Sequence, residues 1–218
     1  SDYSGLSYSS PAGVNDGNSW QGIYLMGKLQ LDAGTFIQRS GEAMNFRDEA
    51  PGYLEVNGGN LIANQFAISS AASTGNYAFT QTGGAIRING NDGTDGGNAL
   101  LNLDNGNMNF SMTGGDLYME GVSSHSPNGI HIGSDAGNYN VTGGTLHVQS
   151  GGNFEVLSTA PFYNIEIVDG STLTQLESLT ALGTVTIQNN AELNTDGFDL
   201  YVGNDFDLQD GGIYSHDN

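Results

Sequence analysis

The chain has 218 residues, of which 34 are glycine and only 13% are charged. An average globular domain carries about 25% charged residues, so solubility must come here largely from Asn, Ser, Thr and Gln side chains. The 24 acidic residues outnumber the four Lys and Arg, and the formal charge of −20 argues against binding to nucleic acid or to anionic membrane surfaces. The absence of cysteine excludes disulfides and thiolate metal sites, and no apolar run approaches the roughly 18 residues of a membrane span.

Glycine-containing corners divide the chain, first at Ala33-Gly34 and then at Gly58-Gly59. Three longer repeats follow, each with a Gly-Asn start, a Thr-Gly-Gly corner and a short alternating strand. The starts are evenly spaced and cover residues 75–79, 106–110 and 137–141. The corners cover residues 82–84, 113–115 and 142–144, and the apolar residues after them are Ile86 and Ile88, Leu117 and Met119, and Leu146 and Val148. Three such copies predict a repeating unit of strand, corner and strand.

Shorter repeats occupy the C-terminal part of the chain. Their apolar positions recur every 20 or 21 residues, at Ile165, Ile167 and Leu173, then Val185, Ile187 and Leu193, then Phe206, Leu208 and Ile213. Among them, Leu176, Leu179 and Leu182 are spaced by three. The flanking Thr and Gly favour a strand and turn there, and a short helix is the alternative.

The repeat pattern predicts how the chain folds. Alternating apolar residues bury one face of a strand, and Gly or Asn supplies the positive φ of a sharp corner. A single coil of this kind is too small to bury its own face, but coils stacked about 4.8 Å apart form one continuous interior. We therefore expect residues 1–218 to form one all-β segment of a longer repetitive protein, a parallel β-helix solenoid of about eight coils. Parallel crossovers favour right-handed coils, and a stacked two-sheet antiparallel solenoid is the alternative.

The two ends of the sequence lack a capping pattern. Neither residues 1–14 nor residues 203–218 read as an amphipathic helix. Open solenoid ends present unpaired strand edges, which associate readily. The expected partners are therefore neighbouring solenoid segments, or copies of the chain stacked end to end.

The loop at residues 89–98 is the candidate metal site. It holds Asp92 and Asp95 among asparagines and glycines, and such oxygen ligands suit Ca²⁺. Its order matches neither a complete EF-hand loop nor the full Gly-Gly-x-Gly-x-Asp repeat. An ordinary polar loop is therefore the favoured interpretation, with calcium at Asp92 and Asp95 as the alternative, and we expect no other cofactor.

Catalytic patterns in the sequence are incomplete. Residues 194–196, Asn-Thr-Asp, resemble one short motif of polygalacturonases, but the Asp-Asp, Gly-His-Gly and Arg-Ile-Lys parts are missing. The four histidines are scattered, at His125, His131, His147 and His216. His147 alternates with two apolar residues, so we expect it to face solvent rather than to bind a metal.

Two further sets of residues have an expected place on the surface. Equivalent corner positions hold Thr82, Thr113 and Thr142, which we expect to stack as a ladder. Candidate outward-facing aromatic residues, which could contact glycans, are Trp20, Tyr118 and Tyr201.

Three segments near the C-terminus resemble the repeat rungs of large Bacteroidota cell-surface proteins. They are residues 162–167, 183–187 and 198–206. The resemblance covers mainly residues 160–218 and more loosely the Thr-Gly-Gly copies. In that group such rungs belong to giant secreted adhesins and related autotransporter-like solenoids, commonly exported by the type IX system and used in attachment or gliding. The resemblance therefore implies a parallel β-helix and a secreted or cell-surface location.

These observations together predict a non-catalytic stalk or adhesive segment of a cell-surface protein. Many weak contacts repeated along the rod would add up to useful avidity, with glycans or other surfaces as the expected ligands. The alternative is a carbohydrate-active β-helix enzyme of the lyase or hydrolase type. A groove with two or three convergent carboxylates would distinguish that enzyme from the adhesive segment.

Overall fold

A computed structural model describes residues 23–38, 43–47, 50–68, 74–90 and 99–216. These residues form 22 strands and contain no helix. The strands belong to three sheets, and every pairing between described strands is parallel. The antiparallel alternative is therefore wrong, because it requires neighbouring strands of opposite direction.

The largest uninterrupted stack is a nine-stranded sheet along the whole rod. Its strands, in stacking order, are β1 (Ile23–Leu25), β4 (Met44–Phe46), β7 (Phe66–Ile68), β10 (Leu101–Leu103), β12 (Ile130–Ile132), β14 (Asn153–Ser158), β16 (Thr172–Gln175), β19 (Glu192–Asn194) and β22 (Ile213–Ser215).

An eleven-stranded sheet forms the other side and holds the glycine corners. Its main path is β2 (Gly27–Leu31), β5 (Gly52–Val56), β8 (Tyr77–Gln81), β11 (Met108–Met119), β13 (Tyr139–Val148), β15 (Asn164–Ile167), β18 (Val185–Ile187) and β21 (Phe206–Leu208). Beyond the corner, β3 (Thr35–Ile37), β6 (Asn60–Ala63) and β9 (Ala85–Ile88) join the second half of β11. A two-stranded sheet contains β17 (Leu179–Ala181) and β20 (Leu200–Val202).

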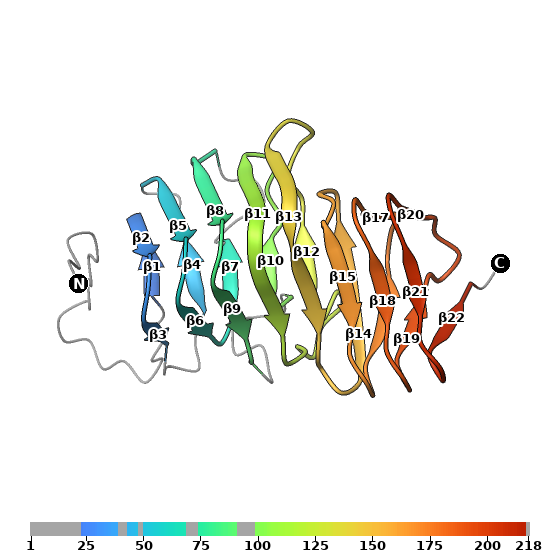
Figure 1. Cartoon of the computed structure of the whole chain (residues 1–218). Coiled ribbons are helices and arrows are strands. Elements are labelled where there is room, and N and C mark those ends of the chain that lie inside the picture. Colours follow the sequence, from blue (N-terminus) through green and yellow to red (C-terminus); the bar gives the residue numbers. More distant parts are fainter. Residues whose placement is uncertain (1–22, 39–42, 48–49, 69–73, 91–98, 217–218) are drawn as a thin grey trace.

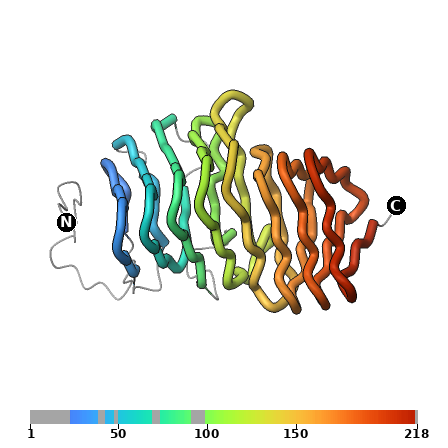
Figure 2. Tube along the Cα trace, viewed as in Figure 1, coloured from blue at the N-terminus to red at the C-terminus, as the bar shows by residue number. Residues whose placement is uncertain are grey.

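The strands follow one another as coils of a solenoid (Figure 1). The chain returns to the nine-stranded sheet once per coil, so its nine strands enclose eight complete coils. The trace shows the coils stacked in sequence order from the N-terminal to the C-terminal end of the rod (Figure 2). The predicted parallel β-helix solenoid of about eight coils is confirmed.

The interior of the solenoid is a continuous apolar column. Within β8, for example, Tyr77 and Phe79 are fully buried while the residue between them is only partly covered, as the period of two requires. Ring contacts run along the rod, with centroid distances of 5.6 Å from Phe66 to Phe79, 5.8 Å from Phe79 to Phe110 and 6.2 Å from Phe110 to Phe162. Each such contact stabilises the stack by about 0.5–1.5 kcal/mol beyond the area that it buries.

Close stacking explains the Gly-Gly corners. A Cβ atom on Gly83 would lie 2.6 Å from the carbonyl oxygen of Asn57, and one on Gly84 would lie 2.6 Å from the carbonyl oxygen of Gly59. Gly84 also has a φ of +67°, a conformation that other residues adopt only at a cost. Both corner positions therefore need glycine because the preceding coil leaves no space, and the second needs it for its backbone as well.

The register between β11 and β13 differs from the predicted one. The even spacing of the Gly-Asn starts places Met108 beside Tyr139, but the structure pairs Phe110 with Tyr139 and Met112 with Val141. The corner glycines stack on each other and fix the register there, and the last two Thr-Gly-Gly corners are closer together in the sequence than the starts that precede them. Because side chains alternate with a period of two, a shift by two positions keeps every apolar side chain inside.

The last coil shows a second register difference. The sequence aligns Leu193 with Ile213, but the structure pairs Leu193 with Tyr214 and places Ile213 beside Glu192. The ring of Tyr214 lies 5.4 Å from that of Phe206 in an edge-on contact. The corner residues Asn190 and Gly211 stack on each other, and Leu193 and Tyr214 each follow their corner by three residues, so Tyr214 takes the inward position.

The three leucines spaced by three form a strand and turn, as favoured by the sequence. Leu179 is the first residue of β17, is 1% exposed and pairs with Leu200. Leu182 follows the strand and is 42% exposed. The helix alternative is wrong, because only one of these side chains is fully buried.

Candidate functional site

A row of charged and aromatic side chains crosses the outer face of the eleven-stranded sheet. In register, Arg87 of β9 lies beside Tyr118 of β11, Tyr118 beside His147 of β13, and His147 beside Glu166 of β15. Residues on either side of each, such as Ile86 and Ile88, are buried, so the row points away from the core. We call these four residues the outer row.

Contacts along the outer row join four coils. The Arg87 guanidinium lies 3.9 Å above the centre of the Tyr118 ring and also forms an ion pair with Glu120. The rings of Tyr118 and His147 are stacked, with centroids 4.4 Å apart and an interplanar angle of 12°. The row is therefore a stacked array of a cation, a phenol and an imidazole, each from a different coil.

His147 is held between two carboxylates. Its Nε2 atom lies 3.0 Å from Oδ1 of Asp116, its Nδ1 atom lies 2.6 Å from Oε2 of Glu166, and its side chain is 13% exposed. The prediction that His147 lies on the outer face is confirmed, but the expectation of a solvated side chain is wrong. Neighbouring coils cover the ring, and both ring nitrogens contact carboxylates.

A second polar network lies on the outer face near the first coils. Lys28 forms an ion pair with Glu55, and Asn57 donates hydrogen bonds to Glu55 and to Asp32 at 2.8 Å each. Contact with Lys28, and then with Asn57, lowers the pKa of Glu55, while the hydrogen bonds from Asn57 and Gln30 lower the pKa of Asp32. These carboxylates are therefore ionised at neutral pH and supply part of the acidic surface.

A groove of about 420 Å³ opens beside the first residues of β13. It is lined on one side by Tyr139 and Val141, and on the other by Pro161, Glu177, Thr180 and Leu182. In Figure 1, β13 extends well beyond the shorter β15 next to it, and the groove lies at this extension. Its size falls within the range of about 300–1,000 Å³ that is usual for ligand sites.

Glu177 supplies the carboxylate of the groove. Burial raises its pKa, while the charge of His131 and a hydrogen bond from the Ser158 backbone lower it. Its Oε1 atom is buried and has no hydrogen-bond partner among the described residues. An acceptor of this kind is costly unless a donor reaches it, so Glu177 is the polar group in the groove that most needs a partner.

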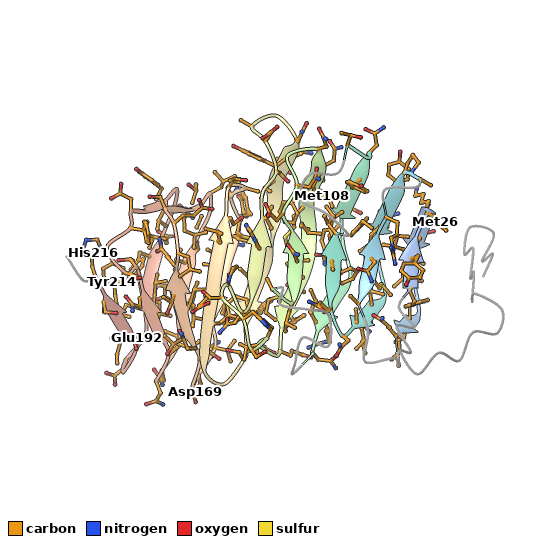
Figure 3. The ribbon with its side chains drawn as sticks, turned by 180° about the vertical axis from the view of Figure 1, so that it is seen from behind. Met26, Met108, Asp169, Glu192, Tyr214 and His216 are labelled. Carbon is orange, nitrogen blue, oxygen red and sulfur yellow. The ribbon has the colours of Figure 1, made fainter. Side chains whose placement is uncertain are left out.

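The last coil exposes apolar side chains at the end of the rod. Phe206 is 40% exposed, Leu208 47%, Ile213 52% and Tyr214 44%. Figure 3 shows Tyr214 and His216 at this end, opposite Met26. The Nδ1 atom of His216 lies 2.6 Å from the hydroxyl of Thr195, so this histidine is part of the coil stacking.

The structure separates the other residues that the sequence singled out. The candidate calcium ligands Asp92 and Asp95, like Trp20, lie outside the described residues. The described residues contain no group of three or more His, Cys, Asp or Glu side chains that could hold a metal ion. His125 contacts Ser124, and His131 lies 3.5 Å from Asp104, so the histidines have separate surroundings.

The remaining surface predictions have different outcomes. Tyr201 is 56% exposed, as expected, and its hydrogen bond to Asp199 raises its pKa. The Asn-Thr-Asp motif at residues 194–196 forms a turn in which Asp196 has a φ of +46°. The threonine ladder is interrupted, because Thr113 pairs with Gly143 rather than with Thr142.

Comparison with known proteins adds no further assignment. No protein-family model matches the chain, and neither the curated proteins nor the solved structures give a match. Within the described part of the chain there is no helix long and apolar enough to cross a membrane. The functional proposal therefore depends on the residues and geometry described above.

Proposed function

We propose that this chain is a non-catalytic segment of a secreted cell-surface solenoid that serves as a stalk or an adhesive surface. The observation that carries this proposal is the outer row, in which four successive coils each add one side chain to a continuous outward-facing array. A rod with a filled interior and repeated outward positions is suited to spanning distance and to presenting many equivalent contacts.

The proposed mechanism is multivalent. Coils stack about 4.8 Å apart, so a long ligand or surface meets a further outward side chain at each coil. Individually weak contacts that engage together raise the overall affinity, because each later contact forms at a high effective concentration. The exposed aromatic residue Tyr201 and the surface amides supply the contacts that suit glycans.

The end of the rod supports the proposed partners. The outer side of β20, β21 and β22 has no strand partner among the described residues, and the inward side chains of this coil are partly exposed. Unpaired strand edges with apolar side chains favour addition of a further coil. We infer that the partner at this end is another solenoid segment or a further copy, stacked end to end.

The enzyme alternative gains no support from the groove. Glycoside hydrolysis requires two carboxylates on opposite sides of the scissile bond. Glu177 is the one carboxylate among the described residues that line the groove. Asp116 and Glu166 do lie close together, but His147 fills the space between them.

Bead adhesion at different protein densities tests the proposal. Beads that carry the chain at increasing density are passed over immobilised polysaccharides and over cells, and retention is compared with beads that carry the same density of the Tyr201→Ala variant. We expect retention to rise more steeply than in proportion to density, to fall for the variant, and to resist competition by soluble monomer. Tight one-to-one binding by the monomer, or cleavage of any polysaccharide tested, would contradict the proposal.

A further inference from the structure

The groove exists because one coil lacks a strand. β13 pairs with β15 only through Thr145–Val148, so its first part, Tyr139–Val141, has no strand on that side among the described residues. The next coil passes this point at residues 159–163, where Phe162 instead forms a bridge to Ala181. The hydrogen-bond ladder is therefore interrupted along three residues, or about 10 Å at roughly 3.3 Å per residue.

The free edge of β13 presents backbone donors and acceptors. The carbonyl of Asn138 accepts a hydrogen bond from the N–H of Phe110, so in a parallel ladder this carbonyl and both backbone groups of Asn140 point towards β11. Tyr139 and Val141 flank Asn140 and direct their N–H and C=O groups the other way, towards the groove. Within the described chain, no backbone hydrogen bond joins either residue to residues 158–163.

The opposite wall does not complete the ladder. Phe162 donates to the carbonyl of Thr180 and accepts from the N–H of Leu182, which directs both of its backbone groups away from β13. Pro161 precedes it and has no N–H to donate. The wall therefore supplies side chains, while β13 alone supplies the strand edge.

We propose that the groove beside β13 binds an extended peptide segment that adds a strand to the free edge of Tyr139–Val141 and directs a basic side chain to Glu177. Strand addition of this kind obtains affinity from main-chain hydrogen bonds and specificity from alternate side chains. Glu177 lines the groove, and its buried Oε1 atom has no partner in the described part of the chain; rotation of this carboxylate towards the groove lets a Lys or Arg side chain supply the missing donor. The formal charge of −20 also favours a basic segment over an acidic one.

The backbone geometry favours a peptide over a glycan as the occupant. A saccharide can hydrogen-bond to Glu177 and pack on Tyr139, but it has no regular donor and acceptor spacing to match alternate residues of a strand. Tyr139 and Val141 present N–H and C=O groups at strand spacing, and an extended peptide matches that spacing. This inference is independent of the adhesive function, since it concerns one groove and not the repeated outer row.

Titration with short peptides followed by amide NMR tests the inference. The probe is an acetylated and amidated pentapeptide of alternating valine and lysine, and the matched controls are its two alternately N-methylated forms, each of which lacks the donors on one edge. We expect the unmodified peptide to shift the amide signals of residues 139–141 and 177–182. We expect one of the two methylated forms to bind at least about tenfold more weakly, because it loses the donors that pair with β13.

Two variants of the chain test the charge requirement. Glu177→Gln keeps the shape of the side chain and is expected to weaken peptide binding by about tenfold or more. The matched control is Asp207→Asn, which changes the charge by the same amount on the exposed strand β21 and is expected to change affinity by less than about twofold. Thermal unfolding of both variants checks that they remain folded.

Several results would overturn the inference. Unchanged amide signals at residues 139–141 at millimolar peptide would show that no peptide strand is added there. Equal affinity of both methylated peptides would show that main-chain hydrogen bonds do not contribute to binding. Unchanged peptide affinity of Glu177→Gln would show that Glu177 does not recognise a basic side chain of the peptide. If a neutral trisaccharide shifts the groove signals and the peptide does not, the groove is a glycan site. Bead adhesion does not depend on peptide binding in the groove, so the two proposals fail separately.

Discussion

Replacement of Gly84 by alanine should destabilise the rod more than replacement of a glycine with the same backbone conformation but free space. Gly84 has a φ of +67°, and an added Cβ would lie 2.6 Å from the oxygen of Gly59 and 2.7 Å from the carbonyl carbon of Gly58. The left-handed conformation costs a non-glycine residue about 1–2 kcal/mol. Contact with backbone atoms that cannot rotate away adds about 1–3 kcal/mol, as overpacking does in cores. We therefore expect Gly84→Ala to lower the free energy of unfolding by about 2–5 kcal/mol.

Gly151 and Gly152, which are adjacent in the sequence, allow the conformational cost and the steric cost to be measured separately. Gly151 has a φ of +65° with nothing within 4 Å of an added Cβ, so Gly151→Ala should lose only the conformational part, about 1–2 kcal/mol. Gly152 also has nothing within 4 Å and no positive φ, so Gly152→Ala should change stability by less than about 0.5 kcal/mol. Urea unfolding followed by circular dichroism measures all three, with the slope checked for a loss of cooperativity. Equal losses for Gly84→Ala and Gly151→Ala would refute the role assigned to coil stacking.

Three further predictions concern charged and aromatic side chains. The native pKa of Glu177 is raised above 4.5, so ionisation of this carboxyl destabilises the fold as pH rises through the native pKa. Glu177→Gln should therefore raise Tm at pH 8 and leave it unchanged below pH 4.5. A lower Tm of this variant at pH 8 would contradict the prediction. Tyr118→Ala should cost about 1–2 kcal/mol in urea unfolding because it removes the contacts with Arg87 and His147, while Tyr118→Phe keeps the ring and should cost less than about 0.5 kcal/mol. If residues 89–98 are an ordinary polar loop, millimolar Ca²⁺ should not change the Tm of chelator-treated protein. If Ca²⁺ instead raises Tm by several degrees, and Asp92→Asn or Asp95→Asn abolishes that rise, calcium binds at these residues.

The sequence predicts the coils because their determinants are local. Alternation in segments such as Ile86–Ile88 defines the buried face, and the Gly-Gly corners define where the chain turns. The register between coils is not local, because it depends on which residues stack across a whole coil of intervening sequence. That is why the start of the third long repeat, at residue 137, gives the wrong partner for β11, while the spacing of the corners gives the right one for the strand residues on either side of the corner.

The burial of certain polar side chains could not be predicted from the sequence either. Gln81 is fully buried, and its side-chain amide donates to the carbonyls of Gly84 and Asp116 in successive coils. Gln175 does the same for the carbonyls of Glu177 and Asp199. A glutamine in an alternating segment reads as an exposed residue, and only the position of carbonyl oxygens from neighbouring coils explains its burial.

The groove did leave a signal in the sequence. The C-terminal repeats are shorter than the spacing between the last two Thr-Gly-Gly corners, so the shorter coils have too few residues for every strand of the longer ones. Pro161 lies at this transition and cannot donate to a ladder. The position of the missing strand could therefore have been inferred, but the unpaired carboxylate oxygen of Glu177 could not, because its burial depends on packing.

The parallel stacking of the coils also determines how the rod responds to tension. The hydrogen bonds between coils run along the rod axis, so a pull on its ends loads one interface at a time and opens the coils serially, as a zipper opens. Each short C-terminal coil that peels away replaces about 4.8 Å of rod with roughly 70 Å of extended chain. Serial opening of the coils therefore lengthens the rod under load and dissipates mechanical energy one coil after another.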